Sequence, residues 1–318
     1  MNIFKSGLIE HKISFGSIFS RYAWISSIKN WKNPKLFRLN NEMIHFYTET
    51  ALEQNYFEKS EQGNLNWMDG NHPFQEYISK MVELGNRVVE FSSGSGYAAK
   101  TFRDVGARYI GFDLNRSALG NTKKANRKDN LIVGDGYQAP ISSDSSDYVV
   151  SFYALEHMVW PQRYIDEMIR VLKPGGIIAL AFPDYVANWK RPMGSVREGR
   201  SSGGIQEKIK KNLWIDVVQS FIERKTINRY LRWKLHRNIY SKSQFRFLIN
   251  LKPVCLVSDY RSDNDAVYFA SEEEVARYLE GKNCIIEKRS GGIKGKNGEN
   301  LDSAKSGNGF VVARLRTE

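Results

Sequence analysis

The middle of the chain alternates between short apolar runs and longer segments in which apolar residues recur three and four positions apart. Short runs of β-branched and aromatic residues predict strands, and the longer periodicity predicts helices. Strands that alternate with helices in this way are typical of a parallel sheet. The expected strands are Val88–Phe91, Tyr109–Asp113, Leu131–Val133, Tyr148–Phe152 and Ile177–Phe182. The expected helices between them are Tyr97–Val105, Ser117–Asn126 and Pro161–Leu172, the last stopped by Lys173–Gly176.

The C-terminal part of the chain resumes this pattern. Ser271–Leu279 opens with a serine and has a glutamate three positions later, which predicts a helix with a capping box. Cys284–Lys288 and Phe310–Leu315 predict strands, and the Gly-rich segment Ser290–Asn308 between them has no helical pattern. We therefore expect an antiparallel hairpin at the end of the sheet.

The N-terminal part is rich in aromatic residues and carries two amphipathic segments, Asn41–Asn55 and Pro73–Leu84. Both predict helices, so the region is interpreted as a helical cap on the sheet. Ser14–Trp31 is basic and aromatic, and a packed arm is favoured over a membrane contact for it.

The predicted fold class is α/β, with a seven-stranded, mostly parallel sheet, an antiparallel terminal hairpin, an N-terminal helical cap and a basic insertion. The predicted division of the chain is the cap at 1–84, the core at 85–184, the insertion at 185–262 and the completion of the sheet at 263–318.

The net charge of +12 is concentrated in the insertion. Between Tyr185 and Arg261 there are 17 Lys and Arg residues but only five Asp and Glu residues, and the remaining residues balance to zero. Such local charge predicts an anionic partner near this segment. Its centre, Asn212–Tyr240, has apolar residues at helical spacing with basic residues between them. Three interpretations stay open: a packed helix with a solvated basic face, a helix on an anionic membrane surface, or a binding site for nucleic-acid phosphates.

Cysteine content and hydropathy bear on location. Cys255 and Cys284 are too few for a disulfide framework or a metal cluster, and no metal is expected. No run of about 20 apolar residues and no secretory signal is visible. The expected location is the cytoplasm, with peripheral contact to the inner membrane surface as the alternative.

Acidic residues stand at the ends of successive predicted strands, where open parallel sheets bind their ligands. Glu90 is followed by the small-residue turn Ser92–Gly96, in which the backbone can approach a ligand closely. Asp113 is placed to accept hydrogen bonds from ribose hydroxyls. Asp135 is placed to accept from an adenine amino group, with Gly136 leaving room for the ring; a turn-forming role is the alternative for Asp135.

Two nucleotide ligands compete for this turn. Gly94-x-Gly96-x-x-Ala99 fits the fingerprint of nicotinamide dinucleotide sites. That fingerprint usually follows its strand directly, whereas an acid and two serines intervene here. Glu90 would repel a pyrophosphate and attract an ammonium group. The sequence therefore favours S-adenosylmethionine (SAM), which carries an ammonium and an adenosine but no phosphate.

At this point the chain resembles the class I SAM-dependent methyltransferases, particularly their type 11 group, which have a Rossmann-like fold. The resemblance extends over about Val88–Asp184 and the final helix–strand–strand unit. Ser92 departs from the family motif, which has its first glycine there. The motifs that carry the resemblance are Val88–Gly96, Tyr109–Asp113, Gly134–Gly136, Pro140–Val150, Leu155–His157 and Arg170–Gly176.

The resemblance implies a role for each of these positions. Glu90, with the backbone of Ser92, Gly94 and Gly96, would hold the methionine end of SAM. Asp113 would bind the ribose, Leu114 would flank the adenine, and Asp135 and Gly136 would face its edge. Tyr153 and Ala154 would lie beside the sulfonium. His157 is the candidate general base, with a helix-start role as the alternative, as for Glu156; His45 and His72 are further candidates from the cap.

The absence of certain motifs narrows the range of possible methyl acceptors. Phe152–Leu155 does not match the tetrapeptide of nucleic-acid amino methyltransferases, and no Pro-Cys pair offers a thiol for pyrimidine methylation. Loose resemblance to methyltransferases of bacterial polysaccharide pathways predicts an acceptor hydroxyl on an anionic or lipid-linked glycan intermediate near the basic insertion. An RNA-modifying enzyme and a non-catalytic binding protein are the alternatives.

Overall fold

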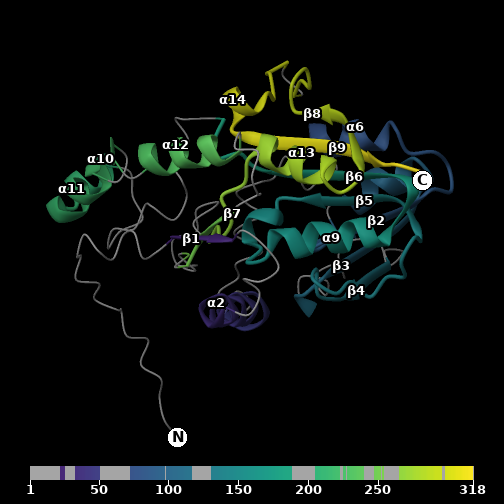
Figure 1. Cartoon of the computed structure of the whole chain (residues 1–318), viewed down its shortest axis with the longest axis horizontal. Helices are drawn as coiled ribbons and strands as arrows, with labels where there is room; N and C mark the ends of the chain where they lie inside the picture. The colour runs from purple at the N-terminus through teal and green to yellow at the C-terminus, as the bar shows by residue number, and fades with distance from the viewer. Residues whose placement is uncertain are drawn as a thin grey trace, which may run out of the picture.

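A central sheet with helices on both faces and a smaller two-stranded sheet make up the fold (Figure 1). The predicted helix Ser117–Asn126 and Cys255 lie outside the described residues. The computed structural model describes residues 22–25, 33–50, 72–96, 98–116, 130–187, 205–222, 225–226, 228–239, 247–251, 253, 265–295 and 298–317.

The strands of the central sheet are β2 (Arg87–Phe91), β3 (Arg108–Asp113), β4 (Asn130–Val133), β5 (Ser146–Phe152), β6 (Leu172–Pro183), β8 (Cys284–Arg289) and β9 (Asn308–Leu315). Within the described part of the chain they lie in the order β4-β3-β2-β5-β6-β9-β8. Neighbours from β4 to β6 are parallel, and β9 runs antiparallel to β6 and β8. The predicted seven-stranded sheet with its terminal hairpin is confirmed.

Helices cover the two faces of the sheet because its buried strands are apolar on both sides. They are α2 (Pro34–His45), α6 (Pro73–Ser79), α7 (Ala99–Asp104), α9 (Pro161–Val171) and α13 (Glu272–Glu280). Side chains alternate along β2, so Val89 and Phe91 join the core cluster that includes residues of α2, α9 and α13. Val88 joins the opposite cluster, with residues of α6 and α7.

The first cap helix begins earlier than its sequence pattern predicts. The prediction was Asn41–Asn55, whereas α2 starts at Pro34 and passes into a π-helical turn, η2 (Phe46–Thr50). Asn33 caps the helix by accepting a hydrogen bond from the Lys35 amide, and a proline at the first helical position favours this start. These capping residues were the missed signal.

The helix α9 ends at Val171 and Ser271 is the N-cap residue of α13, close to the predictions, but three local details differ. Lys173–Gly176 does not separate α9 from the next strand but forms a bulge within β6, opposite a single residue of β5. The Ser290–Asn308 loop contains a short helix, α14 (Ser303–Ser306). Ser271 makes no side-chain cap; Asp184, at the end of β6, accepts from the Glu272 amide at 3.0 Å instead.

A second sheet joins distant parts of the chain. Its strands, β1 (Tyr22–Ile25) and β7 (Phe247–Asn250), pair antiparallel and were not predicted. The insertion also carries α10 (Ile205–Lys210), which was not predicted. Helices α11 (Trp214–Ile222) and α12 (Asn228–Ile239) lie within Asn212–Tyr240, where helical spacing was predicted. No helix among the described residues is both long and apolar enough to cross a membrane. The four-part division of the chain stays a prediction.

Candidate cofactor and acceptor site

The parallel strands β2, β3, β4 and β5 bring the predicted site residues to one edge of the sheet. Glu90 lies opposite Gly111 and Asp113 opposite Val133 in the strand register. Because parallel strands end at the same edge, their C-terminal residues and the turns that follow surround a common space. Tyr153 follows β5 at this edge, next to the turn after β2.

The turn after β2 uses left-handed backbone at three positions. Ser92, Gly94 and Gly96 have φ angles of 54°, 54° and 80°. Glycine adopts such angles without strain, whereas serine does so at a cost. The Ser92 hydroxyl accepts a hydrogen bond from the Tyr164 hydroxyl at 3.1 Å. The Tyr164 hydroxyl also lies 2.9 Å from Ser151 Oγ. Ser92, which stands where the family has a glycine, is therefore hydrogen-bonded to the core beneath the turn.

Glu90 is buried and faces a phenol. Its carboxylate accepts a hydrogen bond from the hydroxyl of Tyr109. Burial raises the pKa of Glu90 to about 8, the Tyr109 hydrogen bond opposes this rise, and the charge of Asp113 adds to it. Gly111 makes the contact possible, because a Cβ there would lie 2.7 Å from the Tyr109 hydroxyl. Sequence reasoning identified Glu90 but missed Tyr109 and Gly111 as its surroundings.

Asp113 ties β3 to the turn after β2. One carboxylate oxygen accepts from the Gly94 amide at 2.9 Å, and the other accepts from the Asn115 amide at 2.8 Å. Burial raises the pKa of Asp113, and hydrogen bonds from the amides of Asn115, Gly94 and Leu114 oppose this rise. Asp113 is therefore held beside the turn at the edge where the ribose was predicted to bind, and Leu114 follows it, half-buried.

The turn after β4 is shaped by its own contacts. Asp135 is exposed, and its Oδ1 accepts from the Tyr137 amide at 2.8 Å, which is the turn-forming geometry named as the alternative. A Cβ on Gly136 would lie 2.5 Å from the ring of the buried Tyr164. The lack of a side chain at Gly136 therefore leaves room for the ring of Tyr164. The contacts of Asp135 and Gly136 with adenine stay predictions.

Tyr153 pairs with one of the two cap histidines. His72 Nδ1 accepts from the Phe74 amide at 3.3 Å, which assigns the ring proton to Nε2, 3.3 Å from the Tyr153 hydroxyl. Burial lowers the pKa of His72 to about 4, so the ring is neutral at pH 7. Ala154 is buried beside this pair. His45, by contrast, is exposed and pairs with Glu49, 3.1 Å away.

His157 ends the 3-10 turn η4 (Leu155–His157) and lies beside two carboxylates. Its Nδ1 is 3.7 Å from Asp265 Oδ2, and its Nε2 is 3.8 Å from Glu156 Oε1. The Tyr47 hydroxyl donates to Asp265 Oδ2 at 2.6 Å, and the rings of Tyr47 and His157 meet edge to face.

Tyr47 and Asp265 were not predicted, because only the folded chain brings them to His157. Tyr47 comes from η2, and Asp265 follows the insertion. The Asn115 side chain donates to the Tyr47 carbonyl, which links this group to the Asp113 loop. The cap, the turn after β3 and the segment that follows the insertion thus converge at one edge of the sheet.

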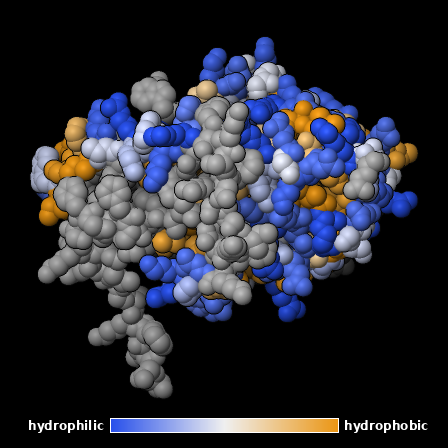
Figure 2. Space-filling view, in the orientation of Figure 1, coloured by the Kyte–Doolittle hydropathy of each residue, from blue (hydrophilic) through white to orange (hydrophobic). Residues whose placement is uncertain are grey.

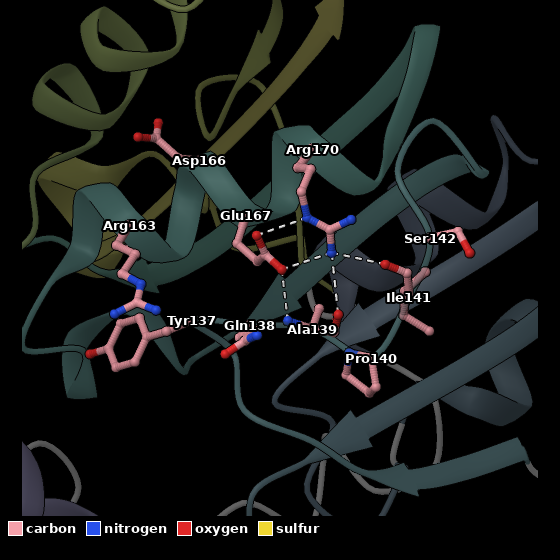
Figure 3. A pocket seen from close by; sticks show the side chains of 10 residues that line it. All are labelled: Tyr137, Gln138, Ala139, Pro140, Ile141, Ser142, Arg163, Asp166, Glu167 and Arg170. Atoms are coloured by element: carbon pink, nitrogen blue, oxygen red, sulfur yellow. Dashed lines mark hydrogen bonds and ion pairs between the residues drawn. The ribbon is translucent and has the colours of Figure 1, made fainter.

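A separate groove runs along α9 (Figure 3). It encloses about 830 Å³ and includes none of the predicted cofactor residues among the described residues that line it. Figure 3 shows Arg170 reaching to the carbonyls of Ala139 and Ile141, while Glu167 accepts from the Ala139 amide. These bonds fix the segment after β4 against α9, so the lining groups serve the fold.

The chain matches a family model over part of its length. Residues 89–180 match the model described as a methyltransferase domain. The matched segment extends from β2 to β6 of the central sheet.

Curated relatives match about a third of the chain. A probable S-adenosylmethionine-dependent methyltransferase of Mycolicibacterium smegmatis is 31% identical over 103 residues, covering 32% of this chain and 40% of the relative. A demethylmenaquinone methyltransferase of Paenarthrobacter aurescens is 28% identical over 100 residues, covering 31% of this chain and 40% of the relative. The matches span about two fifths of the length of these relatives.

Solved structures resemble the chain at low identity. A SAM-dependent methyltransferase of Aquifex aeolicus aligns over 82% of this chain and 98% of its own, with a TM-score of 0.45 and 12% identity. The 1,6-didemethyltoxoflavin-N1-methyltransferase of Burkholderia thailandensis, solved with 1,6-didemethyltoxoflavin and S-adenosylhomocysteine, aligns over 84% of this chain and 89% of its own. Its TM-score is 0.47 at 10% identity.

Proposed function

We propose that this chain is a SAM-dependent methyltransferase whose acceptor is a hydroxyl of an anionic or lipid-linked glycan intermediate. The methyltransferase part rests on the domain at residues 89–180 and on one observation above all. Asp113 and the buried Glu90 flank the left-handed turn at the C-terminal edge of the sheet, with Asp113 bonded to the Gly94 amide.

The residues at this edge fit SAM. A buried carboxylate with a raised pKa, Glu90, is stabilised in its charged form by a neighbouring cation, and the ammonium of the methionine moiety is such a cation. Gly94 and Gly96 present backbone without side chains, and Asp113 supplies carboxylate oxygens for the ribose. When bound, SAM supplies an electrophilic methyl group on a sulfonium.

The chain's own residues would orient the acceptor and exclude water. The Tyr153 hydroxyl lies 3.3 Å from Nε2 of the neutral His72, and its side chain is proposed to lie beside the sulfonium. Placing two reactants in attack geometry accounts for much of the rate enhancement in such a transfer. His157 is the proposed general base for the acceptor hydroxyl, and Asp265 is proposed to orient its ring through Nδ1.

The glycan part of the proposal is supported by charge. Asp265, beside His157, lies just after the insertion, and the insertion carries the excess of basic residues. Anionic sugars or the phosphate of a lipid carrier would be attracted to it. RNA is the second candidate acceptor on the same grounds, and a binding protein without turnover is the third hypothesis.

Incubation with labelled SAM and separated lipid, glycan and RNA extracts tests the acceptor class. The proposal predicts label in the lipid-linked or acidic glycan fraction. Label in RNA alone would assign the protein to the RNA-modifying class, and SAM binding without labelling of any fraction would favour the binding protein.

Once an acceptor is labelled, His157→Ala and Asp265→Asn test the base. His157→Ala is expected to lower kcat by about 100-fold or more while SAM affinity stays unchanged. Asp265→Asn is expected to lower kcat less than His157→Ala, because the imidazole remains and loses only the carboxylate proposed to orient it. His45→Ala is the matched control, and full turnover by His157→Ala would remove the base from the proposal.

A further inference from the structure

The insertion presents an unusual apolar surface. On α11, Trp214, Ile215, Val218 and Phe221 are all 57% to 73% exposed, and their spacing places them along one side of the helix. Figure 2 shows an orange patch over α11 at the left of the molecule. Large apolar residues that gather in this way usually mark an interaction site.

Helix α12, which follows α11 in the chain, packs on the body of the fold. Leu231 and Leu235 are buried in a cluster with Tyr185 and Phe269, close to the end of β6. The other side of α12 exposes Tyr230 and Trp233. Helix α12 is therefore two-sided, with one face packed on the body and one aromatic face turned outward. We refer to the exposed apolar and aromatic residues of the two helices together as the α11–α12 face: Trp214, Ile215, Val218, Phe221, Tyr230 and Trp233.

Basic side chains accompany the rings of the α11–α12 face. Lys225 lies over the ring of Phe221, Lys234 over Tyr230 and Arg237 over Trp233, with cation-to-centroid distances of 5.9, 5.7 and 5.5 Å. Residues 205–239 contain nine Lys and Arg against three Asp and Glu. Apolar and aromatic groups bordered by cations suit the boundary between lipid headgroups and acyl chains, where the cations meet phosphates.

We propose that the α11–α12 face docks on an anionic phospholipid bilayer. A second copy of the chain is a poor occupant, because two such faces would bring positive charge against positive charge. Nucleic acid is also a poor occupant, because Ile215 and Val218 would meet neither a base stack nor a phosphate. The proposal is independent of the acceptor and holds for any substrate class.

Vesicle flotation tests this inference with the full chain. Vesicles of phosphatidylcholine alone are compared with vesicles that also contain phosphatidylglycerol. The protein is expected to float with the anionic vesicles only, and added salt is expected to weaken binding, because exposed charges are screened. Equal binding to both vesicles, or binding to neither, would overturn the proposal.

Surface variants separate the two contributions. The double variant Phe221→Ser with Trp233→Ser is expected to bind anionic vesicles roughly tenfold or more weakly, because it removes two apolar anchors. Arg237→Gln is expected to lose about fivefold, the effect of one basic residue near a charged membrane. The matched controls, Ile285→Ser and Arg108→Gln, change an exposed apolar and an exposed basic residue on the central sheet and are expected to bind like the wild type.

Folding controls and two alternative binding assays complete the test. An unchanged thermal midpoint and SAM affinity show that the variants remain folded, and vesicle binding by the double variant equal to wild type would overturn the proposal. Light scattering that shows a dimer lost in the double variant would assign the face to a second copy instead. Retention on RNA without vesicle binding would assign it to nucleic acid.

Discussion

Glu90 is the residue on which cofactor recognition is proposed to depend, and Tyr109 lies against its carboxylate. The Tyr109 hydroxyl donates to the carboxylate and opposes the rise in pKa caused by burial. In Tyr109→Phe, the pKa of Glu90 is expected to rise further, so less carboxylate is available to the ammonium of SAM. We expect SAM affinity to fall about tenfold, in line with the loss of a hydrogen bond to a charged group.

Calorimetric titration with SAM at neutral pH measures this effect. Tyr148→Phe is the matched control, because its hydroxyl donates to the Met81 carbonyl, away from Glu90. Equal affinity for Tyr109→Phe and the wild type would show that the phenol does not tune the site.

A second buried carboxylate gives the protein a pH-dependent stability. Burial raises the pKa of Glu274 from 4.5 to about 8, while the Tyr268 hydroxyl donates to it at 2.8 Å. The folded protein therefore holds a proton that the unfolded chain releases above pH 4.5. The stability that this proton contributes is complete below pH 4.5 and is lost as pH rises through about 8.

Glu274→Gln removes this dependence. Relative to the wild type, its free energy of unfolding is expected to increase between pH 5 and pH 8, by up to about 1.4 kcal/mol per pH unit. Urea unfolding at several pH values measures the difference, and the exposed Glu280→Gln serves as control. A difference between variant and wild type that is independent of pH would contradict the assigned proton.

The sequence predicted residues that sit at strand ends and missed residues that arrive from elsewhere. Glu90 and Asp113 follow β-branched or aromatic runs, so local pattern is enough to place them at the edge of the sheet. Tyr47 and Asp265 are separated by 218 positions and meet only in the folded chain. No periodicity in either segment indicates this contact, which explains why His157 was predicted without its carboxylate neighbour.

At the scale of elements, the turn after β4 depends on a glycine for a packing reason. A Cβ at Gly136 would lie 2.5 Å from the buried Tyr164 ring, which hydroxyl contacts with Ser92 and Ser151 hold in place. Gly136→Ala is expected to lower the free energy of unfolding by about 1–3 kcal/mol, since overpacking forces the ring to shift.

Denaturant unfolding checks the Gly136→Ala prediction. Gly291→Ala is the control, because its added Cβ would approach only Asp302 at an ordinary 3.6 Å, and its effect is expected to stay within about 0.5 kcal/mol. If both substitutions have the same small effect, Tyr164 does not constrain the turn.

Strands were predicted correctly where a local run of apolar residues was enough to define them. The core strands have apolar runs with clear ends, and their boundaries agree with the structure to within about two residues, except at β6. There the Lys-Pro-Gly-Gly segment forms a bulge, although its composition suggests a break. The pairing of β1 with β7 depends on a partner more than 200 residues away, so neither short segment predicts it alone.

At the scale of the whole molecule, the basic excess and the predicted cofactor site lie in different parts of the chain. The acids of the predicted cofactor site lie in the sheet, and the basic excess lies in the insertion, which packs through α12 against residues that follow β6. Composition located the basic segment correctly in sequence. Which of its apolar residues are packed and which belong to the α11–α12 face could be told only from the burial of their side chains in the structure.

The central claim is that SAM binds at the C-terminal edge of the sheet through Glu90 and Asp113. Calorimetric titration of SAM into the wild type, Asp113→Ala and the exposed control Asp104→Ala tests it most directly. We predict one site per chain in the wild type and in Asp104→Ala, and affinity at least about tenfold weaker in Asp113→Ala, where hydrogen bonds to a charged group are lost. Equal SAM affinity for Asp113→Ala and the wild type, or no binding by the wild type, would contradict the claim.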